Sequence, residues 1–181
     1  LQVLDGLHYA HTAAITLHAP SGEEMNVNGV VHRDFKPGNI FIQHDGRKAT
    51  YKVADFGLAK AFQCAGFTSH TTAGDYCGTF RYMPRSQILN YRYAKPVVDI
   101  WAAMATYYGM LTGYPVRDFR RGEDYAFTVL QRDPVPIRER DPHIPKKIAS
   151  LVDSILIPFD ECEKDCMSAG ELRDEIREAL R

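Results

Sequence analysis

No charge of one sign dominates the sequence, and no long apolar run interrupts it. Lys and Arg number 22 against 23 for Asp and Glu, which leaves a formal net charge of −1. Proteins that bind nucleic acids or acidic membranes usually carry a basic excess or a basic stripe, so this balance argues against both kinds of partner. The longest uncharged apolar run, Ile100 to Leu111, is shorter than the roughly 20 residues that span a bilayer. We therefore expect no membrane-spanning segment and no nucleic-acid partner.

Cysteine is scarce in the sequence. Only 4 cysteines are present, too few and too scattered for the disulfide framework of a secreted fold. Cys162 and Cys166 could share a helix face, but no second Cys or His pair has the spacing of a structural zinc site. The beginning of the chain shows no signal-peptide pattern. These absences predict free thiols in a reducing compartment and a cytoplasmic location.

What the sequence does contain is typical of one globular domain. It has 181 residues, of which 45% are hydrophobic and 25% charged, so a core can form and the charge bias is too small for disorder. The opening segment is predicted to be a helix with one buried face, because apolar residues and histidines recur at helical spacing at Leu1, Leu4, Leu7, His8 and His11. Turn-forming residues predict a surface loop or hairpin at 19–29, and a long irregular loop is expected at 62–75.

Short β-like runs precede a helical second half. They occupy 30–31, 40–42 and 51–54, with the turn Asp45-Gly46 between the last two. Helices are predicted at 97–111, 124–131, 145–157 and 168–180. The first of these four is apolar nearly all round, as in a helix buried in a core, and Ser168 with Glu171 forms a capping-box pattern at the start of the last. These patterns predict an α+β fold that is mainly α-helical.

Two segments join a β-like run to a set of polar residues. VVHRDFKPGNIFI occupies 30–42 and KVADFGLAK occupies 52–60. The first matches the H-R-D-x-K-x-x-N pattern of protein kinases and the second their D-F-G pattern. Gly78-Thr79 with 82–84 resembles the end of an activation segment, and Asp99-Ile100-Trp101 resembles a D-x-W segment. Because the four segments occur in the right order, the chain resembles the C-terminal lobe of a eukaryotic-type serine/threonine protein kinase.

The resemblance implies a division of residues 1–181. They would form a protein kinase domain without its N-terminal lobe, with a catalytic loop at 32–39, an activation segment at 55–86 and a helical subdomain at 87–181. A small β-hairpin region is expected at the catalytic loop. The family's glycine-rich loop, ATP-anchoring lysine and glutamate partner have no counterpart in this sequence. We therefore expect a fragment of a longer kinase that is inactive without its N-lobe, the partner that completes it.

The resemblance also assigns roles in phosphoryl transfer, a reaction that depends on positioning and electrostatic stabilisation. Asp34 would accept the proton of the substrate hydroxyl and Lys36 would balance charge on the γ-phosphate. Asn39 completes the catalytic set, and Asn39 with Asp55 would hold Mg²⁺, since a hard cation prefers oxygen ligands. Phe41 would form the apolar floor under the adenine. ATP and Mg²⁺ are thus the expected cofactors, and Lys36, Asn39, Phe41 and Asp55 the expected ATP-binding residues.

Three other residues are expected to support the site. The resemblance makes His32 a scaffold residue that packs and hydrogen-bonds. Asp99 is expected to accept hydrogen bonds from backbone N–H groups of the catalytic loop, because a carboxylate in an apolar helix needs such partners. Trp101 is expected to lie in the core.

The activation segment bears on the substrate and on regulation. Lys36 and Thr79 are typical of kinases that act on serine or threonine, and we expect the Thr79 hydroxyl to bond both Asp34 and Lys36. A protein substrate is therefore expected.

Arg33 suggests regulation by an anion on the activation segment, because an unpaired arginine is answered by phosphate or a carboxylate. Asp75 stands where relatives are often phosphorylated. We hypothesise that it pairs with Arg33, and with Lys60, as a built-in substitute for phosphate. Thr71 and Thr72 are candidate phosphosites, with a merely solvated loop as the alternative interpretation.

The sequence departs from the family pattern at a structural ion pair. Residues 83–86 read M-P-R-S where the family has A-P-E, and 166–169 read C-M-S-A where it has a stretch like R-P-S-A. Both halves of the pair are absent together, as expected when a pair is replaced as a unit, since one buried charge left alone costs several kcal/mol. The alternative is a swap in which Arg85 reaches Glu163 or Asp165.

The function expected from these features is transfer of the γ-phosphate of Mg-ATP to a protein Ser or Thr hydroxyl. Two alternatives stay open. A small-molecule phosphotransferase of the aminoglycoside-kinase type shares the logic of the paired aspartates and the asparagine. A pseudokinase scaffold is suggested by the altered A-P-E, although the intact set Asp34, Lys36, Asn39 and Asp55 argues against it.

Overall fold

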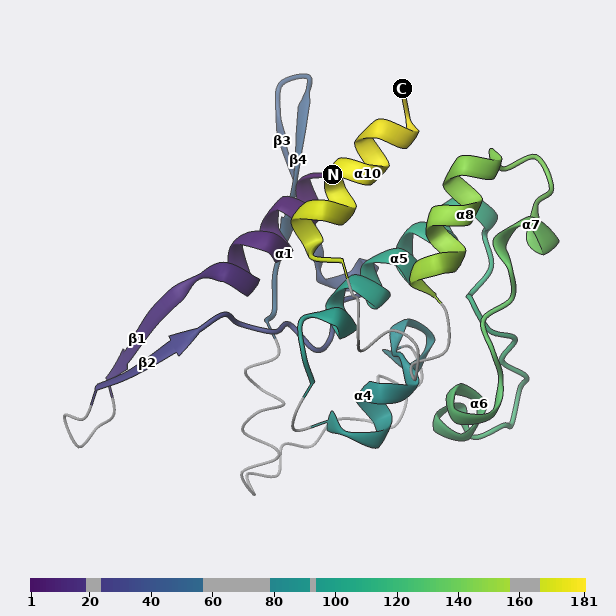
Figure 1. Ribbon diagram of the computed structural model, residues 1–181, viewed down its shortest axis with the longest axis horizontal. Helices are drawn as coiled ribbons and strands as arrows, with labels where there is room; N and C mark the ends of the chain where they lie inside the picture. Colours follow the sequence, from purple (N-terminus) through teal and green to yellow (C-terminus); the bar gives the residue numbers. More distant parts are fainter. Residues whose placement is uncertain (19–23, 57–78, 92–93, 157–166) are drawn as a thin grey trace.

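The computed structural model describes residues 1–18, 24–56, 79–91, 94–156 and 167–181. Figure 1 shows a mainly helical body from which two β-hairpins project. The elements follow one another in the order α1 (Gln2–Thr12), β1 (Ala14–His18), β2 (Glu24–Asn28), η1 (Pro37–Asn39), β3 (Ile40–Asp45), β4 (Lys48–Val53), η2 (Phe80–Tyr82), α4 (Arg85–Leu89), α5 (Val97–Thr112), α6 (Tyr125–Gln131), α7 (Ile137–Arg140), α8 (Lys146–Ile155) and α10 (Ala169–Ala179).

Helix α5 is the centre of the core, and its sequence explains why. It is apolar around most of its circumference, so it is most stable when other elements cover it on all sides. Gly113 ends it in the left-handed conformation, with φ of 74°, and donates its N–H to the carbonyl of Gly109. Helices α1, α8 and α10 bury apolar side chains in the same core, among them Leu7, Val152 and Leu172, each fully inaccessible to solvent.

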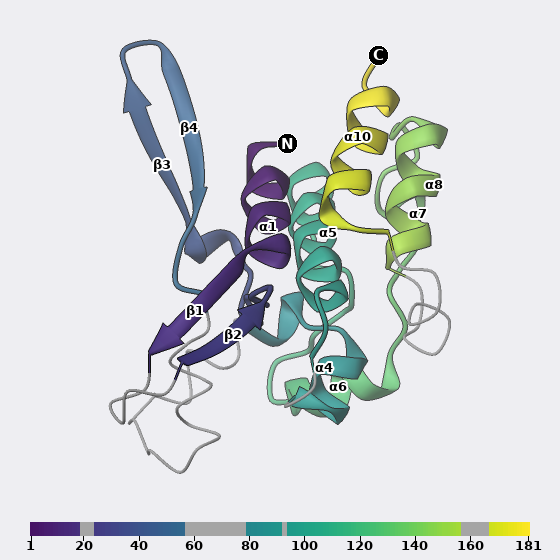
Figure 2. The same ribbon diagram turned by 60° about the vertical axis from the view of Figure 1, so that its left-hand side comes forward.

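The two hairpins lie on the same side of the helical body (Figure 2). Strands β1 and β2 pair antiparallel with Ala14 opposite Asn28 and His18 opposite Glu24. Strands β3 and β4 pair antiparallel from Ile40 opposite Val53 to Asp45 opposite Lys48. The turn of this second hairpin, at Asp45 and Gly46, was predicted from the sequence. The first confirms the hairpin interpretation of 19–29, although its first strand begins earlier, at Ala14.

One predicted strand is wrong. Val30 and Val31 are irregular, because the N–H of Val30 donates to the carbonyl of Ala10 at 2.8 Å instead of to a strand. Gly29 makes the approach possible: its φ is 80°, and a Cβ there would lie 2.5 Å from the carbonyl oxygen of His11. The chain thus passes from the first hairpin directly over the end of α1 into the loop at 32–39.

The longer helices are confirmed within a few residues of their predicted bounds. Helix α10 carries the expected capping box, in which the Ser168 hydroxyl accepts from the N–H of Glu171 at 3.2 Å and the Glu171 carboxylate accepts from the N–H of Ser168 at 2.7 Å. The short elements η1, η2, α4 and α7 were not predicted, since runs of three to five residues are too short to show a periodicity.

Several predictions concern segments outside the described residues. The irregular loop expected at 62–75 lies there, as do the free thiols expected at Cys64, Cys77, Cys162 and Cys166. Among the helices that the structure describes, none is long and apolar enough to cross a membrane.

Candidate active site

The buried carboxylate of Asp99, in the first turn of α5, binds backbone N–H groups of the loop at 32–39. Asp99 Oδ2 accepts from the N–H of His32 at 2.7 Å, and Oδ1 accepts from the N–H of Arg33 at 2.8 Å. His11 Nε2, near the end of α1, lies 2.8 Å from the same Oδ2. Since a buried carboxylate is stable only with such partners, α1, α5 and the loop hold one another in place. The contacts expected for Asp99 are therefore present.

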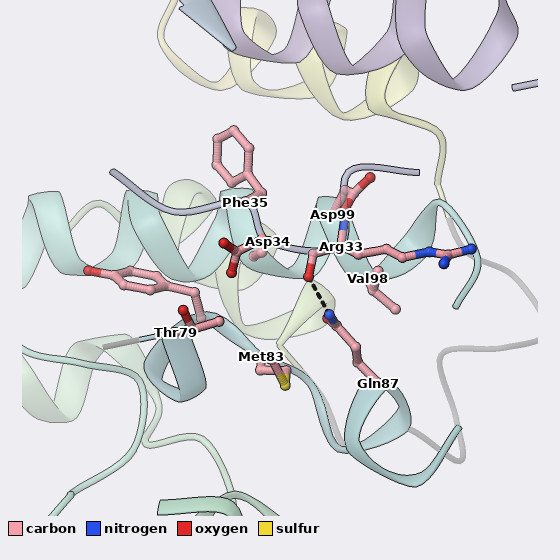
Figure 3. Close-up of a pocket in the computed structure, with 10 residues that line it drawn as sticks. Arg33, Asp34, Phe35, Thr79, Met83, Gln87, Val98 and Asp99 are labelled. Carbon is pink, nitrogen blue, oxygen red and sulfur yellow. Dashed lines mark hydrogen bonds between the residues drawn. The ribbon is translucent and has the colours of Figure 1, made fainter. Parts of the chain in front are cut away.

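The loop backbone is strained where it turns toward the site. Arg33 has φ of 65°, a conformation that residues other than glycine rarely adopt. Strain of this kind persists only when the surroundings over-determine it, and here Asp99 holds the N–H of Arg33 while Gln87 Nε2 donates to its carbonyl. Figure 3 shows the Arg33–Gln87 hydrogen bond.

His32 joins the catalytic loop to the segment after β4. Its ring is fully buried, its Nε2 lies 2.8 Å from the carbonyl oxygen of Ala54, and its Nδ1 accepts from the N–H of Asp34 at 3.3 Å. The ring also packs against Phe35 and Phe56, with centroids 5.8 Å and 4.7 Å away. These contacts fit a scaffold role for His32.

Asp34, Lys36, Asn39 and Thr79 converge at the mouth of the loop. Lys36 Nζ lies 3.1 Å from Asp34 Oδ2 and donates to Thr79 Oγ1 at 3.0 Å. Asn39 Nδ2 donates to the carbonyl of Asp34 at 2.8 Å. Lys36 and Thr79, 43 positions apart in sequence, thus meet, and the lysine holds a carboxylate and a hydroxyl side by side. The contact expected between Thr79 and Lys36 is present.

Asp55 is brought to this cluster by the β3–β4 hairpin. Ala54 donates its N–H to the carbonyl of Asn39 at 2.9 Å, so the residue after Ala54 lies next to the end of the catalytic loop. Asp55 is exposed and has φ of 55°, the second non-glycine residue in the left-handed region among those described. Phe41, on β3, is 59% exposed. No group of three His, Cys, Asp or Glu side chains that could hold a metal occurs within the described ranges.

A hollow beside Asp34 is closed by η2, α4 and α5. Figure 3 shows Asp34 on one side of it and Thr79 and Met83 on the other. Gln87 and Asp99 also line it, and both are almost completely buried. Gln87 and His11 are supporting residues that sequence reasoning missed. The helical spacing placed His11 on the buried face of the first helix but did not indicate its partner, and no sequence signal marked Gln87.

The predicted partners of Arg33 lie outside the part of the chain that the structure describes. These are Lys60 and Asp75, together with the candidate phosphosites Thr71 and Thr72. Arg33 Nε is buried and has no hydrogen-bond acceptor among the described residues. The pairing of Arg33 with Asp75 stays a prediction.

Comparison with known families decides the identity of this arrangement. The family model of the protein kinase domain matches residues 1–162. The chain belongs to the protein kinase family. It is 32% identical over 137 residues to cyclin-dependent kinase 8 of Drosophila melanogaster, covering 72% of this chain and 27% of the relative. It is 33% identical over 156 residues to calcium/calmodulin-dependent protein kinase type II of Caenorhabditis briggsae, covering 86% and 25%.

A third relative is the serine/threonine-protein kinase DCLK3 of Homo sapiens, 37% identical over 109 residues that cover 59% of this chain and 16% of that protein. The matches to these relatives therefore span about a quarter of their length or less.

Arg85, which stands where the family pattern has the glutamate of A-P-E, contacts α6 and the residues after it. Arg85 Nη2 lies 2.7 Å from Asp133 Oδ1, and Arg85 Nε donates to the carbonyl of Val129 at 3.1 Å. The guanidinium thus ties α4 to the end of α6. Glu163 and Asp165, the partners that the swap hypothesis named, lie outside the described residues.

A second arginine, Arg117, is buried and forms no salt bridge with a carboxylate among the described residues. Arg117 is 2% exposed, lies over the ring of Trp101 with its Cζ 4.8 Å from the ring centroid, and donates from Nε to the carbonyl of Arg132 at 2.8 Å. Burial, with a smaller contribution from the charge of Arg85, lowers the pKa of the Arg117 guanidinium to about 9. Trp101 lies in the core, as expected, and forms the floor under this cation.

Proposed function

We propose that this chain is the C-terminal lobe of a serine/threonine protein kinase and transfers the γ-phosphate of ATP to a protein hydroxyl. The observation that carries the proposal is the contact of Lys36 with both Asp34 and Thr79, at 3.1 Å and 3.0 Å. A carboxylate that orients a hydroxyl and a cation that stabilises the transferred phosphoryl group are what this reaction needs.

In this proposal Asp34 orients the attacking hydroxyl and accepts its proton. Lys36 lies 3.1 Å from the carboxylate and presents its charge to the phosphoryl oxygens. Thr79 accepts a hydrogen bond from the same ammonium group, so its hydroxyl lies beside the carboxylate that would receive the substrate. A threonine at this place is typical of kinases that act on serine or threonine.

Asn39 and Asp55 fit the requirements of a magnesium site. Asn39 uses its amide nitrogen on the carbonyl of Asp34, which leaves its side-chain oxygen as an acceptor. Asp55 presents an exposed carboxylate at the end of β4. Oxygen ligands from one or two side chains together with ATP phosphates are typical of Mg²⁺ in such sites. When bound, the cation neutralises charge on the phosphates.

We also propose that an N-terminal lobe covers the β3–β4 hairpin. Ile42 and Tyr51, which pair across the two strands, are 55% and 43% exposed on one face of the hairpin, and Phe41 is 59% exposed on the other. Soluble proteins usually cover exposed apolar side chains of this kind. Phe41 would face the adenine in the completed cleft. Fragments without the covering lobe are expected to bind Mg-ATP weakly.

The test is phosphate transfer by the natural full-length polypeptide in Mg-ATP, followed by intact-mass and peptide mass spectrometry. Asp34→Asn should lower the transfer rate by about 100-fold or more, because it removes the proton acceptor. Asp45→Asn, at the exposed tip of β3, is the matched control and should keep the wild-type rate.

Three other results would reject the proposal. ATP binding without transfer to any substrate would indicate a pseudokinase. Transfer to small alcohols but not to peptides would indicate a small-molecule phosphotransferase. Equal rates for wild type and Asp34→Asn would remove Asp34 from the mechanism.

A further inference from the structure

Three exposed arginines, Arg81, Arg120 and Arg121, form what we call the arginine patch. Arg81 belongs to η2, two residues after Thr79, and the other two belong to the connection between α5 and α6. None of the three forms a salt bridge with a carboxylate within the described part of the chain. Their charges are therefore available to a partner.

The acidic residues of the same connection are already engaged. Asp118 pairs with Arg140 at 2.5 Å. Glu123 accepts two hydrogen bonds from Arg132, at 2.8 Å and 2.7 Å, which lower the pKa of that carboxyl. Asp124 caps α6 by accepting a backbone N–H of its first turn at 3.1 Å. Because these carboxylates bind other groups, they form no salt bridge with the arginine patch. The patch is therefore a local excess of positive charge in a chain whose formal net charge is −1.

The patch lies beside the candidate active site, since ring contacts hold the connection against η2. The Arg81 guanidinium lies 6.0 Å from the centroid of the Phe119 ring, and that ring packs edge-on against Tyr125 at 5.0 Å. Helix α6 also contacts η2 directly. Because η2 begins immediately after Thr79, a peptide whose hydroxyl reaches Asp34 would place its neighbouring residues along this surface.

We propose that the arginine patch binds carboxylate side chains that flank the phosphorylated residue, so that this kinase prefers acidic peptide substrates. The inference rests on the proposed function. A guanidinium presents paired donors that match a carboxylate, which favours an acidic side chain over a neutral one. The patch is small and the rest of the chain is balanced in charge, so a peptide fits it better than an extended polyanion.

The experiment compares three peptides that share one serine and differ only in the flanking residues, which are Glu, Gln or Lys. With the full-length kinase, kcat/KM should fall in the order Glu, Gln, Lys. The double variant Arg120→Gln/Arg121→Gln should lower kcat/KM for the Glu peptide by about 2- to 5-fold per arginine, the range typical of exposed ion pairs. The change should appear in KM, and raising the salt concentration should reduce it.

Arg177→Gln is the matched control, because it removes the same charge from α10 and should leave the peptide preference unchanged. Equal kcat/KM for the Glu and Gln peptides would overturn the inference while the proposed function stands. An equal loss for all three peptides in the double variant would also overturn it.

Binding without turnover separates the two proposals. Fluorescence anisotropy with labelled peptides that carry alanine in place of the serine should show the same Glu preference in the absence of ATP. If no peptide is phosphorylated but the Glu peptide still binds more tightly and loses affinity in the double variant, the patch inference holds and the proposed function fails. If binding shows no preference, the inference is overturned.

Discussion

Two residues on or beside α5 carry buried charges, and the two charges have different hydrogen-bond partners. Asp99, 1% exposed, is satisfied by two backbone N–H groups of the catalytic loop and by His11. Arg117, 2% exposed, has a tryptophan ring, one well-formed carbonyl contact and no salt bridge among the residues described. The Asp99 carboxylate connects α1, α5 and the loop at 32–39, whereas the Arg117 guanidinium packs in the core.

The difference in partners indicates which of the two buried charges the fold requires. A charge whose partners are backbone groups of a functional loop cannot be removed without leaving those groups unpaired. A charge that is desolvated, stacked on a ring and held by only one well-formed carbonyl contact can be replaced by an apolar side chain of similar volume at little loss. Removal of the buried charge should therefore lower the free energy of unfolding at Asp99 and raise it at Arg117.

The largest effect is expected for Asp99→Ala. The substitution leaves two buried N–H groups and His11 without an acceptor, and each unsatisfied group costs about 1 to 3 kcal/mol. We expect the free energy of unfolding to fall by about 3 to 5 kcal/mol in urea denaturation. Asp174→Ala, at an exposed carboxylate of α10, is the control and should change it much less, because exposed ion pairs contribute little. A loss at Asp99 no greater than at Asp174 would contradict the interpretation.

The opposite sign is expected for Arg117→Met. Methionine keeps the contact with Trp101 and removes the desolvated charge, so we expect the free energy of unfolding at pH 7 to rise by about 1 to 2 kcal/mol. A loss of more than about 1 kcal/mol would show instead that the cation contributes net stability.

The pH dependence sharpens this comparison. The pKa of Arg117 is lowered to about 9 in the folded state, whereas the unfolded chain keeps the ordinary, much higher pKa of an arginine. Above pH 9 the unfolded state therefore binds more protons at this site, and its contribution to stability rises with pH. The advantage of Arg117→Met should be full below pH 9 and shrink by about 2 kcal/mol by pH 10.5. Taking the difference between the two proteins cancels other groups that titrate there.

Sequence reasoning succeeded where the signal is local. The buried helix 97–111 was predicted from an unbroken apolar run, and its observed bounds are Val97–Thr112. The loop at 32–39 was located from its resemblance to the H-R-D-x-K-x-x-N pattern of protein kinases, and its catalytic role stays a prediction. The turn of the β3–β4 hairpin was also predicted, since Gly46 supplies a φ of 58° that few other residues adopt.

What could not be predicted depends on contacts between distant residues. His11 and Asp99 are 88 positions apart, and Gln87 and Arg33 are 54 apart, so neither pair leaves a local pattern. The strand predicted at Val30 and Val31 failed for a related reason. Two β-branched residues favour extended pairing, but the N–H of Val30 is taken by the end of α1.

A smaller effect is expected for His11→Leu. It removes one of the three groups that satisfy Asp99, while the backbone of the catalytic loop still holds the carboxylate. We expect a loss of about 1 to 2 kcal/mol in the free energy of unfolding. His11→Gln keeps a side-chain donor and should recover part of the loss. If the glutamine variant is as unstable as the leucine variant, packing rather than the hydrogen bond is responsible.

The smallest effect is expected for Arg85→Ala, and it depends on Arg117. Arg85 loses its pair with Asp133, which is 70% exposed and so worth less than about 1 kcal/mol, and its hydrogen bond to Val129. The same substitution removes a positive charge that lowers the pKa of Arg117, which partly offsets the loss. In the Arg117→Met background the offset disappears, and Arg85→Ala should be more destabilising by a few tenths of a kcal/mol or more. A double-mutant cycle in urea measures this coupling, and additive effects would show that the two guanidinium groups do not interact.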